Sequence, residues 1–590
     1  MKRFNYKYLI ILAVGILGSC NEDYLAESNP NLIASENYWK DLTDTNKGLT
    51  AAYSALLDEN ALAIATDALR SDMGWPGYGR PTPTSKGESV TWYSQTYNNS
   101  TAGVIDHWNA CYKGIYRANQ VIEALNNLKT TGVVTTSNEK QWVQQMAEAR
   151  FLRGLFHFYL HSSYNNGEII IRDFVPKIQD DLNTPLSTSQ QVITFFRDDL
   201  KYAFDNLDFK PAAIGRATKG AAATILGTSH LYENEIDLAK GYFNDIITNS
   251  SYGYELVTDM SLLFTTKGEF NKESIFEIEY NNKYRLDINN FDTQSMVSPL
   301  ASYTTNTGDR SFFVPAWIAY AYKTEEKDIK DDRNYYLKAG VKTLRNVPLR
   351  ASAMITLVED EQTPYYASGT VSDNIKTNGT QWGFSFYKKY SNHDILATSE
   401  NDLPINRNYS GKNVIVNRLA DVYLMQAECL IKSGDNDGAI KLINKIRARW
   451  ALKLIGPSYD ATKTFDGITY TPGATGTLMK RLMEIEKPLE MSVEGHAIRF
   501  NDLRRWGLLV SNFQKLADAT YYVEDYTFVN STTLKNVTKK FMSVVTVKGI
   551  KPSFTVDFEY DISLSNFNIA TQSYLPIPYT ELTTNTALQK

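Results

Sequence analysis

The chain is short of several features that would each indicate a particular class of protein. Three cysteines in 590 residues are too few for a fold held together by disulfide bonds. Cys111 and Cys429 lie in helical patterns and fit best as small buried residues, with a bridge between them as the alternative. Beyond the N-terminal segment, no apolar run reaches the eighteen or more residues that a transmembrane helix needs. The net charge is −5 and there is no basic block, which argues against nucleic acid as a partner.

Motifs for catalysis and for cofactors are also missing. The sequence contains no phosphate-binding loop, no dinucleotide fingerprint and no Ser-His-Asp signature. His157 and His161 are four residues apart, a spacing that a metal can bridge, but Phe158 stands where a zinc hydrolase has glutamate. We therefore expect no enzyme, no cofactor and no metal site.

One catalytic alternative stays open. Glu484, Glu486 and Glu490 lie close together in a helical pattern. A glycoside hydrolase needs two carboxylates a few ångströms apart, and a sequence does not show that distance. Pairing with arginine or exposure to solvent is the simpler interpretation, so a helical-repeat glycosidase is the less favoured hypothesis.

The N-terminus has the plan of a secretory signal. Three basic residues precede about ten mostly apolar residues, 8–17, a run too short to span a bilayer. Gly18 and Ser19 then stand directly before Cys20. This arrangement resembles a bacterial lipoprotein signal, which predicts a signal peptide at 1–19, lipid on Cys20 and a tether over 20–35. The alternative is an ordinary signal peptide with a chance cysteine.

Helical periodicity dominates two parts of the chain. Apolar residues at helical spacing predict helices at about 36–58, 104–128, 141–162, 187–207, 216–233, 237–249, 418–432 and 436–449. Gly434 suits the left-handed residue that ends a helix, and Asp435 suits the cap of the next one. Successive helical hairpins indicate tetratricopeptide-like pairs, so we predict a mainly α fold of about four pairs at 36–250 and 415–510. A few short strands are expected, including 273–280 and a small β-rich segment at about 520–564.

Two irregular, aromatic-rich blocks interrupt this scaffold, at about 63–102 and 251–407. The chain has 38 tyrosines and nine tryptophans, and carbohydrate-binding proteins use aromatic rings to stack on sugar faces. Packing of a large core is the alternative use for most of them. We predict a ligand site in these blocks, with aromatic candidates Trp75, Trp92, Trp317, Trp382, Tyr78, Tyr93 and Tyr320 and polar candidates Asp67, Arg70, Asp72, Asp309 and Arg310.

Several motifs in order resemble one family. They are Glu148-Ala149-Arg150-Phe151-Leu152-Arg153, Arg216-Ala217-Thr218-Lys219-Gly220, Arg418-Leu419-Ala420-Asp421 with Tyr423, Ala427 and Glu428, Asp502-Leu503-Arg504-Arg505-Trp506-Gly507, and Tyr574-Leu575-Pro576-Ile577-Pro578. Behind a lipoprotein signal, this series resembles the SusD/RagB family of outer-membrane nutrient-binding lipoproteins of Bacteroidetes. Glu22-Asp23 also resembles the surface-export tag of such lipoproteins. The chain departs from the family at Glu486-Lys487, where the family usually has Glu-Arg.

The resemblance implies a function as well as a fold. It implies a single domain over 36–590 that binds a glycan at the cell surface and delivers it to a TonB-dependent SusC-like transporter in the outer membrane, without catalysis. A peptide-binding member of the same family is the first alternative. A plain tetratricopeptide scaffold for protein partners is a weaker one, because it leaves both aromatic-rich blocks unexplained.

Overall fold

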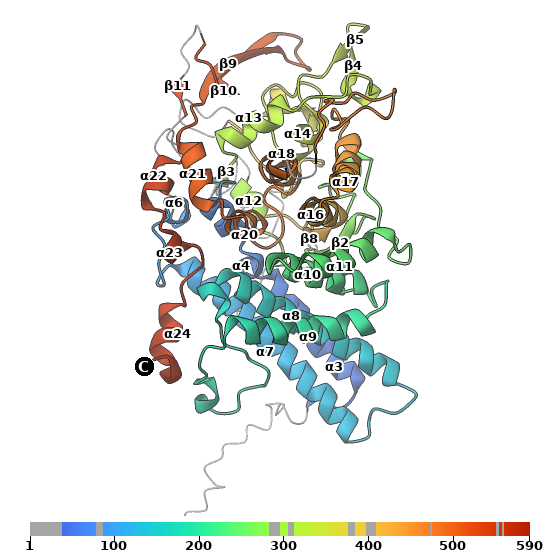
Figure 1. Ribbon diagram of the computed structural model, residues 1–590, viewed down its shortest axis with the longest axis vertical. Helices are drawn as coiled ribbons and strands as arrows, with labels where there is room; N and C mark the ends of the chain where they lie inside the picture. Colours follow the sequence, from blue (N-terminus) through green and yellow to red (C-terminus); the bar gives the residue numbers. More distant parts are fainter. Residues whose placement is uncertain are drawn as a thin grey trace, which may run out of the picture.

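The computed structural model describes residues 38–77, 87–281, 296–304, 312–375, 384–396, 409–471, 475–549, 554–556 and 560–589. Helices make up most of its regular structure, and the strands are short and gathered into small sheets (Figure 1). The mainly α prediction is therefore confirmed. Within the described residues, no helix is both long and apolar enough to cross a membrane.

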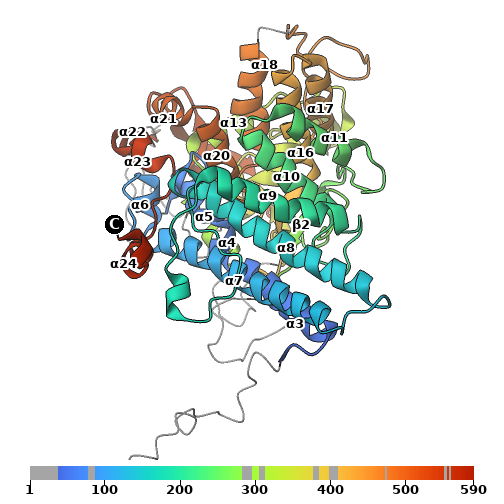
Figure 2. The same cartoon turned by 60° about the horizontal axis from the view of Figure 1, so that its bottom comes forward.

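The first two helix pairs come from the N-terminal third of the chain. Helix α3 (Leu42–Ser54) packs against α7 (Ala102–Thr130), and α8 (Glu139–Ser163) packs against α9 (Ser189–Asn206). Asp41 caps α3 by accepting hydrogen bonds from two backbone N–H groups of its first turn. Because α7 also packs on α8, the helices form one continuous layer, which Figure 2 shows as neighbouring rods.

The next two pairs continue the array. Helix α10 (Lys219–Tyr232) packs on α11 (Ile236–Thr248), and α16 (Leu419–Lys432) packs on α17 (Asn436–Arg449). The turn between α16 and α17 is as predicted: Gly434 has φ +84°, and the Asp435 carboxylate accepts from Gly438 N–H. Helix α11 packs directly on α16, although the second irregular block separates them in sequence. Both blocks are thus insertions into a repeat array.

The first block lies between the partners of the first pair. The 3₁₀ turn η2 (Ala55–Leu57) and helix α4 (Glu59–Leu62) lead into it, and it contains α5 (Ile64–Arg70), β1 (Trp75–Pro76) and α6 (Ser89–Tyr93). The 3₁₀ turns η3 (Asn165–Gly167) and η4 (Gln179–Leu182) follow later, between α8 and α9.

The second block lies between α11 and α16 and is built from short elements. In chain order they are η5 (Met260–Leu262), β2 (Ser274–Ile278), α12 (Leu300–Thr304), β3 (Phe312–Phe313), α13 (Ala316–Thr324), η6 (Asp332–Asn334), β4 (Tyr335–Lys338), β5 (Val341–Leu344), α14 (Leu349–Met354), β6 (Pro364–Tyr365), β7 (Ser368–Thr370), α15 (Val371–Asn374) and β8 (Val414–Arg418). Strand β2 confirms the predicted strand at 273–280 and pairs antiparallel with β8, which leads into α16.

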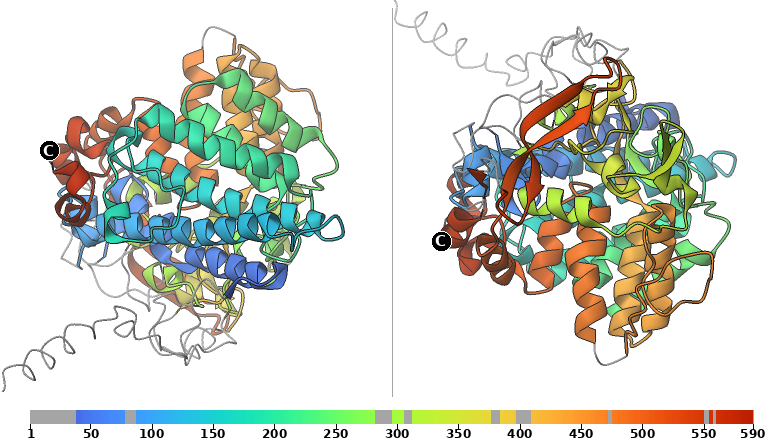
Figure 3. Two further views of the ribbon diagram at one scale, coloured as in Figure 1. Left: turned by 90° about the horizontal axis from the view of Figure 1, so that it is seen from below. Right: turned by 90° about the horizontal axis from the view of Figure 1, so that it is seen from above.

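The C-terminal part returns along the scaffold and then forms a hairpin. Its elements are α18 (Thr475–Arg481), the π-helical turn η8 (Leu482–Glu486), α19 (Lys487–Glu490), α20 (Ile498–Arg505), α21 (Leu509–Ala517), β9 (Tyr522–Val529), β10 (Asn536–Val545), β11 (Phe554–Thr555), α22 (Asp561–Asn566), α23 (Ile569–Gln572), α24 (Tyr579–Thr584) and η9 (Thr586–Leu588). The antiparallel pair of β9 and β10 lies across the irregular half (Figure 3, right). Strands β9, β10 and β11 all lie within the β-rich segment predicted at about 520–564.

A buried ion network joins the helix pairs to the irregular half. Arg418, at the end of β8, is fully buried and donates from Nη1 to Glu273 and Glu490, each at 2.8 Å, and from Nε to Glu494 at 2.7 Å. Arg449 of α17 bonds to Glu273 and Glu490 as well. Buried charges are tolerated when they are paired and hydrogen-bonded. The network therefore fixes how four separate segments meet.

The two cysteines in helices are both buried and free. Their interpretation as small core residues is confirmed, and the alternative of a bridge between them is wrong.

Candidate ligand-binding site

The two irregular blocks meet at one antiparallel pair of short strands. Trp75 of β1 stands opposite Phe313 of β3, and Pro76 stands opposite Phe312. The Tyr387 hydroxyl donates to the Met73 backbone oxygen at 2.7 Å. The sequence left open whether the ligand face uses one block or both. In the structure the blocks share this junction, which we call the β1–β3 junction.

The tryptophan candidates form the floor of the junction. Trp75, Trp92 and Trp317 are 1%, 3% and 9% exposed. Trp75 lies edge-on to Tyr93 with ring centroids 5.2 Å apart, and Trp317 Nε1 donates to the Asp72 backbone oxygen at 2.7 Å. The expectation that these rings offer open faces to a sugar is therefore wrong for this conformation. A segment with few helices must bury its own large rings to form a core.

The polar candidates of the first block are held by the protein itself. Asp72 is fully buried and receives two hydrogen bonds from Arg499, at 2.9 and 2.7 Å. Arg70 donates to the Tyr97 hydroxyl at 3.0 Å and lies 3.7 Å from Asp67. Burial raises the pKa of Asp67 to about 7, although Arg70 opposes the shift. These three groups orient the floor and are not open to a ligand, which corrects the expectation that they bond its hydroxyls.

Of the described aromatic candidates, Tyr320 is the one that is partly open. Tyr93 is buried, whereas Tyr320 is half-buried in the middle of α13. Its ring lies 5.8 Å from Tyr521, and its hydroxyl accepts from Thr546 at 3.3 Å.

The remaining candidates, Cys20, Tyr78, Trp382, Asp309 and Arg310, lie outside the described residues. Four of them are nevertheless close in sequence to the junction. Tyr78 comes two residues after Pro76, and Arg310 two residues before Phe312. Trp382 precedes a described segment in which Ser385 accepts from the Val314 backbone N–H at 3.3 Å. Their role in ligand binding stays a prediction.

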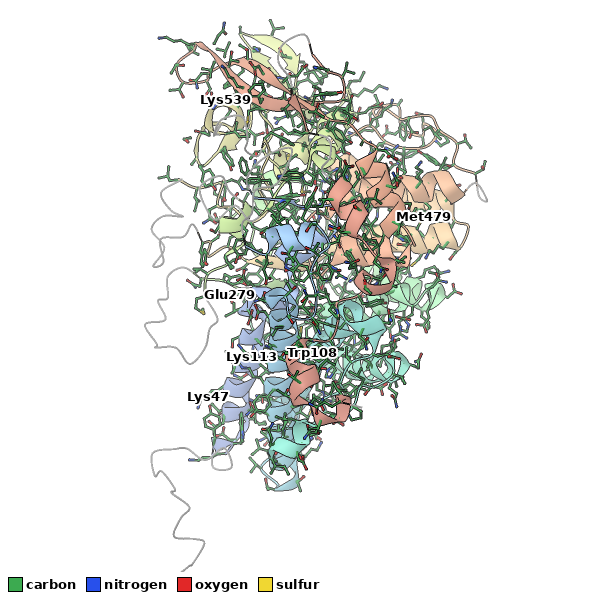
Figure 4. All side chains as sticks on the ribbon, turned by 90° about the vertical axis from the view of Figure 1, so that its left-hand side faces the viewer. Lys47, Trp108, Lys113, Glu279, Met479 and Lys539 are labelled. Carbon is green, nitrogen blue, oxygen red and sulfur yellow. The ribbon has the colours of Figure 1, made fainter. Side chains whose placement is uncertain are left out.

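A polar groove lies beside this region. Its volume is about 500 Å³, and its lining is Leu57, Asp58, Glu59, Asn60, Asp106, Asn109, Ala110, Lys113, Pro299 and Tyr409. One lining residue, Pro299, directly precedes helix α12, which packs on β3. Figure 4 labels Lys113, which lines the groove, and Trp108, which lies on the same helix α7.

The charges of the groove are mixed. Lys113 Nζ lies 3.9 Å from Asp58, whose carboxylate also caps α4 by accepting from Asn60 N–H. The pKa of Asp106 is raised by burial and by the negative charges of Asp58 and Glu88. Carboxylates, amides and an ammonium group within one groove suit a ligand with many hydroxyls. This groove could not be predicted from the sequence, because Asp106, Asn109 and Lys113 have the pattern of an ordinary solvent-facing side of an amphipathic helix.

The glutamates considered for hydrolysis are committed elsewhere. Glu486 is buried and accepts from Arg447 at 2.7 Å, and Glu490 is part of the buried ion network. Burial alone would raise the pKa of each, but the neighbouring arginines outweigh it and lower both to about 2. A general acid needs a pKa near the working pH, so neither suits that role. Glu484 pairs with Lys515 at 3.1 Å near the surface.

The two histidines that a metal might bridge are engaged in hydrogen bonds with the protein. His157 Nδ1 bonds to the Arg153 carbonyl at 2.8 Å, and its Nε2 accepts from Arg172 N–H. His161 Nε2 lies 2.8 Å from the Ser189 hydroxyl. Burial lowers the pKa of both imidazoles. Across the described ranges, no group of three or more His, Cys, Asp or Glu is placed to hold a metal.

Solved structures share this fold. A SusD superfamily protein of Bacteroides vulgatus matches 93% of this chain and 98% of its own, with a TM-score of 0.67 and 22% identity. A laminarin-binding SusD-like protein matches with a TM-score of 0.61 and 20% identity, over 92% and 98% of the two chains. A structure with a xylogluco-oligosaccharide matches with a TM-score of 0.63, also at 20% identity and over the same shares.

Sequence comparisons agree with the structural ones. A SusD-like protein, P25, of Formosa agariphila is 24% identical over 529 residues, which are 86% of this chain and 91% of that protein. A model described as "Starch-binding associating with outer membrane" matches residues 24–231. The model of the SusD family matches residues 272–590, more than half of the chain. The chain therefore belongs to the SusD family.

Proposed function

We propose that this protein is a lipid-anchored, cell-surface glycan-binding protein that passes oligosaccharides to a SusC-like outer-membrane transporter. The family supports the general role, and two of the structural relatives are described with laminarin or with a xylogluco-oligosaccharide. The observation that carries the proposal is the β1–β3 junction, because it brings two aromatic-rich blocks to one place.

The ligand site in this proposal has two parts. Trp382, Tyr78, Asp309 and Arg310, which the sequence predicts as ligand residues, provide the contacts. The groove with Asn109 and Lys113 adds donors and acceptors for hydroxyl groups. Binding is reversible, with an affinity between about micromolar and millimolar, since the ligand has to be released to the transporter. No catalytic step is part of this role.

Exchange of the two aromatic candidates tests the site. Trp382→Ala and Tyr78→Ala should each weaken binding of at least one polysaccharide by about tenfold, because a stacked ring is lost. Calorimetry with laminarin, xyloglucan and starch measures the effect on the full chain. Tyr459→Ala is the control, since Tyr459 is 67% exposed in a loop that does not line the groove. If both variants bind every polysaccharide like the wild type, the proposed site is wrong.

The same samples separate the alternatives. A mixed peptide library added to the panel tests the peptide-binding alternative, which the polar lining of the groove makes less favourable than a glycan. An assay for new reducing ends after incubation tests the glycosidase alternative. Release of reducing ends by the wild type would contradict a purely binding role.

A further inference from the structure

We propose a second saccharide-binding pocket on the helical side of the molecule, formed where the α9–α10 loop meets the turn before β2. The pocket has a volume of about 240 Å³. This is below the roughly 300–1,000 Å³ of sites for drug-sized ligands, so its size suits one or two sugar rings. The inference rests on the proposed function, because it names another contact for the same class of ligand.

Aromatic rings from three segments line this pocket. Phe209 comes from the α9–α10 loop, Tyr252 and Tyr254 from the segment after α11, and Phe270 from the turn before β2. The rings of Tyr252 and Tyr254 are stacked, with centroids 5.8 Å apart and planes at 15°. Phe209 lies edge-on to Tyr252 at 4.9 Å. Tyr252 is itself buried, at 2% exposed, and backs the other rings, whereas Phe209 and Tyr254 are half-buried and Phe270 is exposed. These three partly open rings beside a cavity match the apolar C–H faces of a sugar.

Phe270 has two properties that core packing does not explain. Its side chain is 40% exposed, and its backbone has φ +52°, a left-handed conformation that is costly for a residue with a bulky side chain. Its N–H donates to both carboxylate oxygens of Glu277, at 3.0 and 3.1 Å. Glu277 is buried and also accepts from Asn413 at 2.9 Å. The protein thus holds a strained backbone in place and keeps an aromatic ring at the rim of a cavity, and such strain clusters at ligand sites.

Polar groups complete the pocket. Lys210 Nζ donates to the Tyr252 carbonyl at 3.4 Å and has no other hydrogen-bond partner among the residues that the structure describes. An ammonium group has three donors, so two remain for a ligand. The Tyr254 hydroxyl lies 3.3 Å from that of Thr218. Gly253 permits this arrangement, because a Cβ there would lie 2.9 Å from Lys210 Nζ.

The chemistry favours a neutral sugar over an anion or a peptide. The other two cations of the lining are already paired, Arg216 with Glu148 at 3.1 Å and Lys272 with Glu255 at 3.0 Å. A small cavity with aromatic walls and a few spare hydrogen-bond donors suits a ring with hydroxyl groups.

Removal of the exposed ring tests the pocket. Phe270→Gly deletes the side chain and fits the left-handed backbone, so the fold is kept. Phe174→Gly is the matched control, because Phe174 is 42% exposed and does not line the pocket. Calorimetry on the full chain with laminarin and with xylogluco-oligosaccharide should show about a three- to tenfold loss of affinity or the loss of one binding site in Phe270→Gly alone. Hydroxyl-radical footprinting of the wild type should show protection of Tyr254 and Phe270 by the bound saccharide.

Two results would contradict this inference, and they differ in what they say about the proposed function. If the wild type binds a saccharide, but Phe270→Gly behaves like Phe174→Gly and neither ring is protected, the second pocket is wrong while the proposed function stands. If the wild type binds no saccharide of the panel, the proposed function fails and this inference fails with it.

Discussion

Single residues show how strongly burial decides the role of a side chain. The β1–β3 junction contains tryptophan and aspartate side chains, which carbohydrate sites also use. Here these side chains are buried and form internal packing contacts and hydrogen bonds. Composition reports how many aromatic rings a chain has, whereas their exposure depends on contacts between distant segments. Asp72 illustrates this, since its partner Arg499 is more than 400 residues away in the sequence.

Buried carboxylates predict how stability depends on pH. The pKa values of Glu428, Glu486 and Glu490 are each lowered to about 2. Burial alone would raise them, but the arginines around these carboxylates outweigh that effect. An unfolded glutamate has a pKa of about 4.3, so the stabilisation is complete above about pH 5 and is lost as the pH falls towards 2. The buried His107 acts in the same direction from about pH 6.5 downwards, because burial lowers its pKa to about 4. Asp67 opposes part of this fall, because burial raises its pKa to about 7.

We therefore expect the free energy of unfolding to fall by several kcal/mol between pH 7 and pH 4. Urea denaturation followed by circular dichroism at pH 7, 5.5 and 4 measures it. A stability that is flat over this range would contradict the ionised state of these three glutamates. Proton uptake on unfolding, measured at pH 5, gives an independent check.

At the scale of elements, helices were the most predictable part. The eight helices predicted from periodicity correspond to α3, α7, α8, α9, α10, α11, α16 and α17, with ends that differ by a few residues at most positions. The largest difference is at α3, which is shorter than predicted. Near Pro488 the structure has a π-helical turn before a short α19. Local patterns succeed here because helical hydrogen bonds join residues four apart.

Alanine in place of two helix glycines should change the free energy of unfolding in opposite directions. A Cβ on Gly114 of α7 would lie 2.1 Å from the buried ring of Phe156 on α8, whereas a Cβ on Gly241 of α11 would meet nothing within 4 Å. Gly114→Ala should therefore cost about 1–3 kcal/mol through overpacking between α7 and α8. Gly241→Ala should add about 0.5–1 kcal/mol, because alanine favours the helix.

Urea denaturation of the two variants beside the wild type measures both effects. The same alanine at two helix positions controls for helix propensity. A stabilising effect of Gly114→Ala would mean that the two helices do not pack as closely as the structure shows.

At the scale of the molecule, the fold is a helical-repeat array with two large insertions. Each insertion lies between helices that pack on one another, α3 with α7 and α11 with α16. The scaffold is therefore continuous while the inserted blocks join at the β1–β3 junction. This division gives a continuous helical scaffold and a separate loop-rich half, which fits the function proposed above.

The proposed anchor makes a prediction for the whole molecule. Cys20→Ala should release the chain from the membrane fraction, because no lipid can be attached and a chain without acyl groups has no durable anchor. Centrifugation of cell lysates and partition into detergent measure the release. Cys429→Ala is the control, since Cys429 is a buried free thiol and its loss leaves the anchor intact. A Cys20→Ala chain that stays in the membrane fraction would contradict lipid anchoring.

The sequence by itself determined the helices, the cap at Asp435, the strand at β2 and the family. These features depend on residues close together in the chain, or on motifs in a fixed order. The tertiary structure decided which aromatic rings are buried, how β1 pairs with β3, and that Asp106, Asn109 and Lys113 line a groove. Each of these depends on contacts between segments that are tens to hundreds of residues apart, and a local pattern carries no information about such contacts.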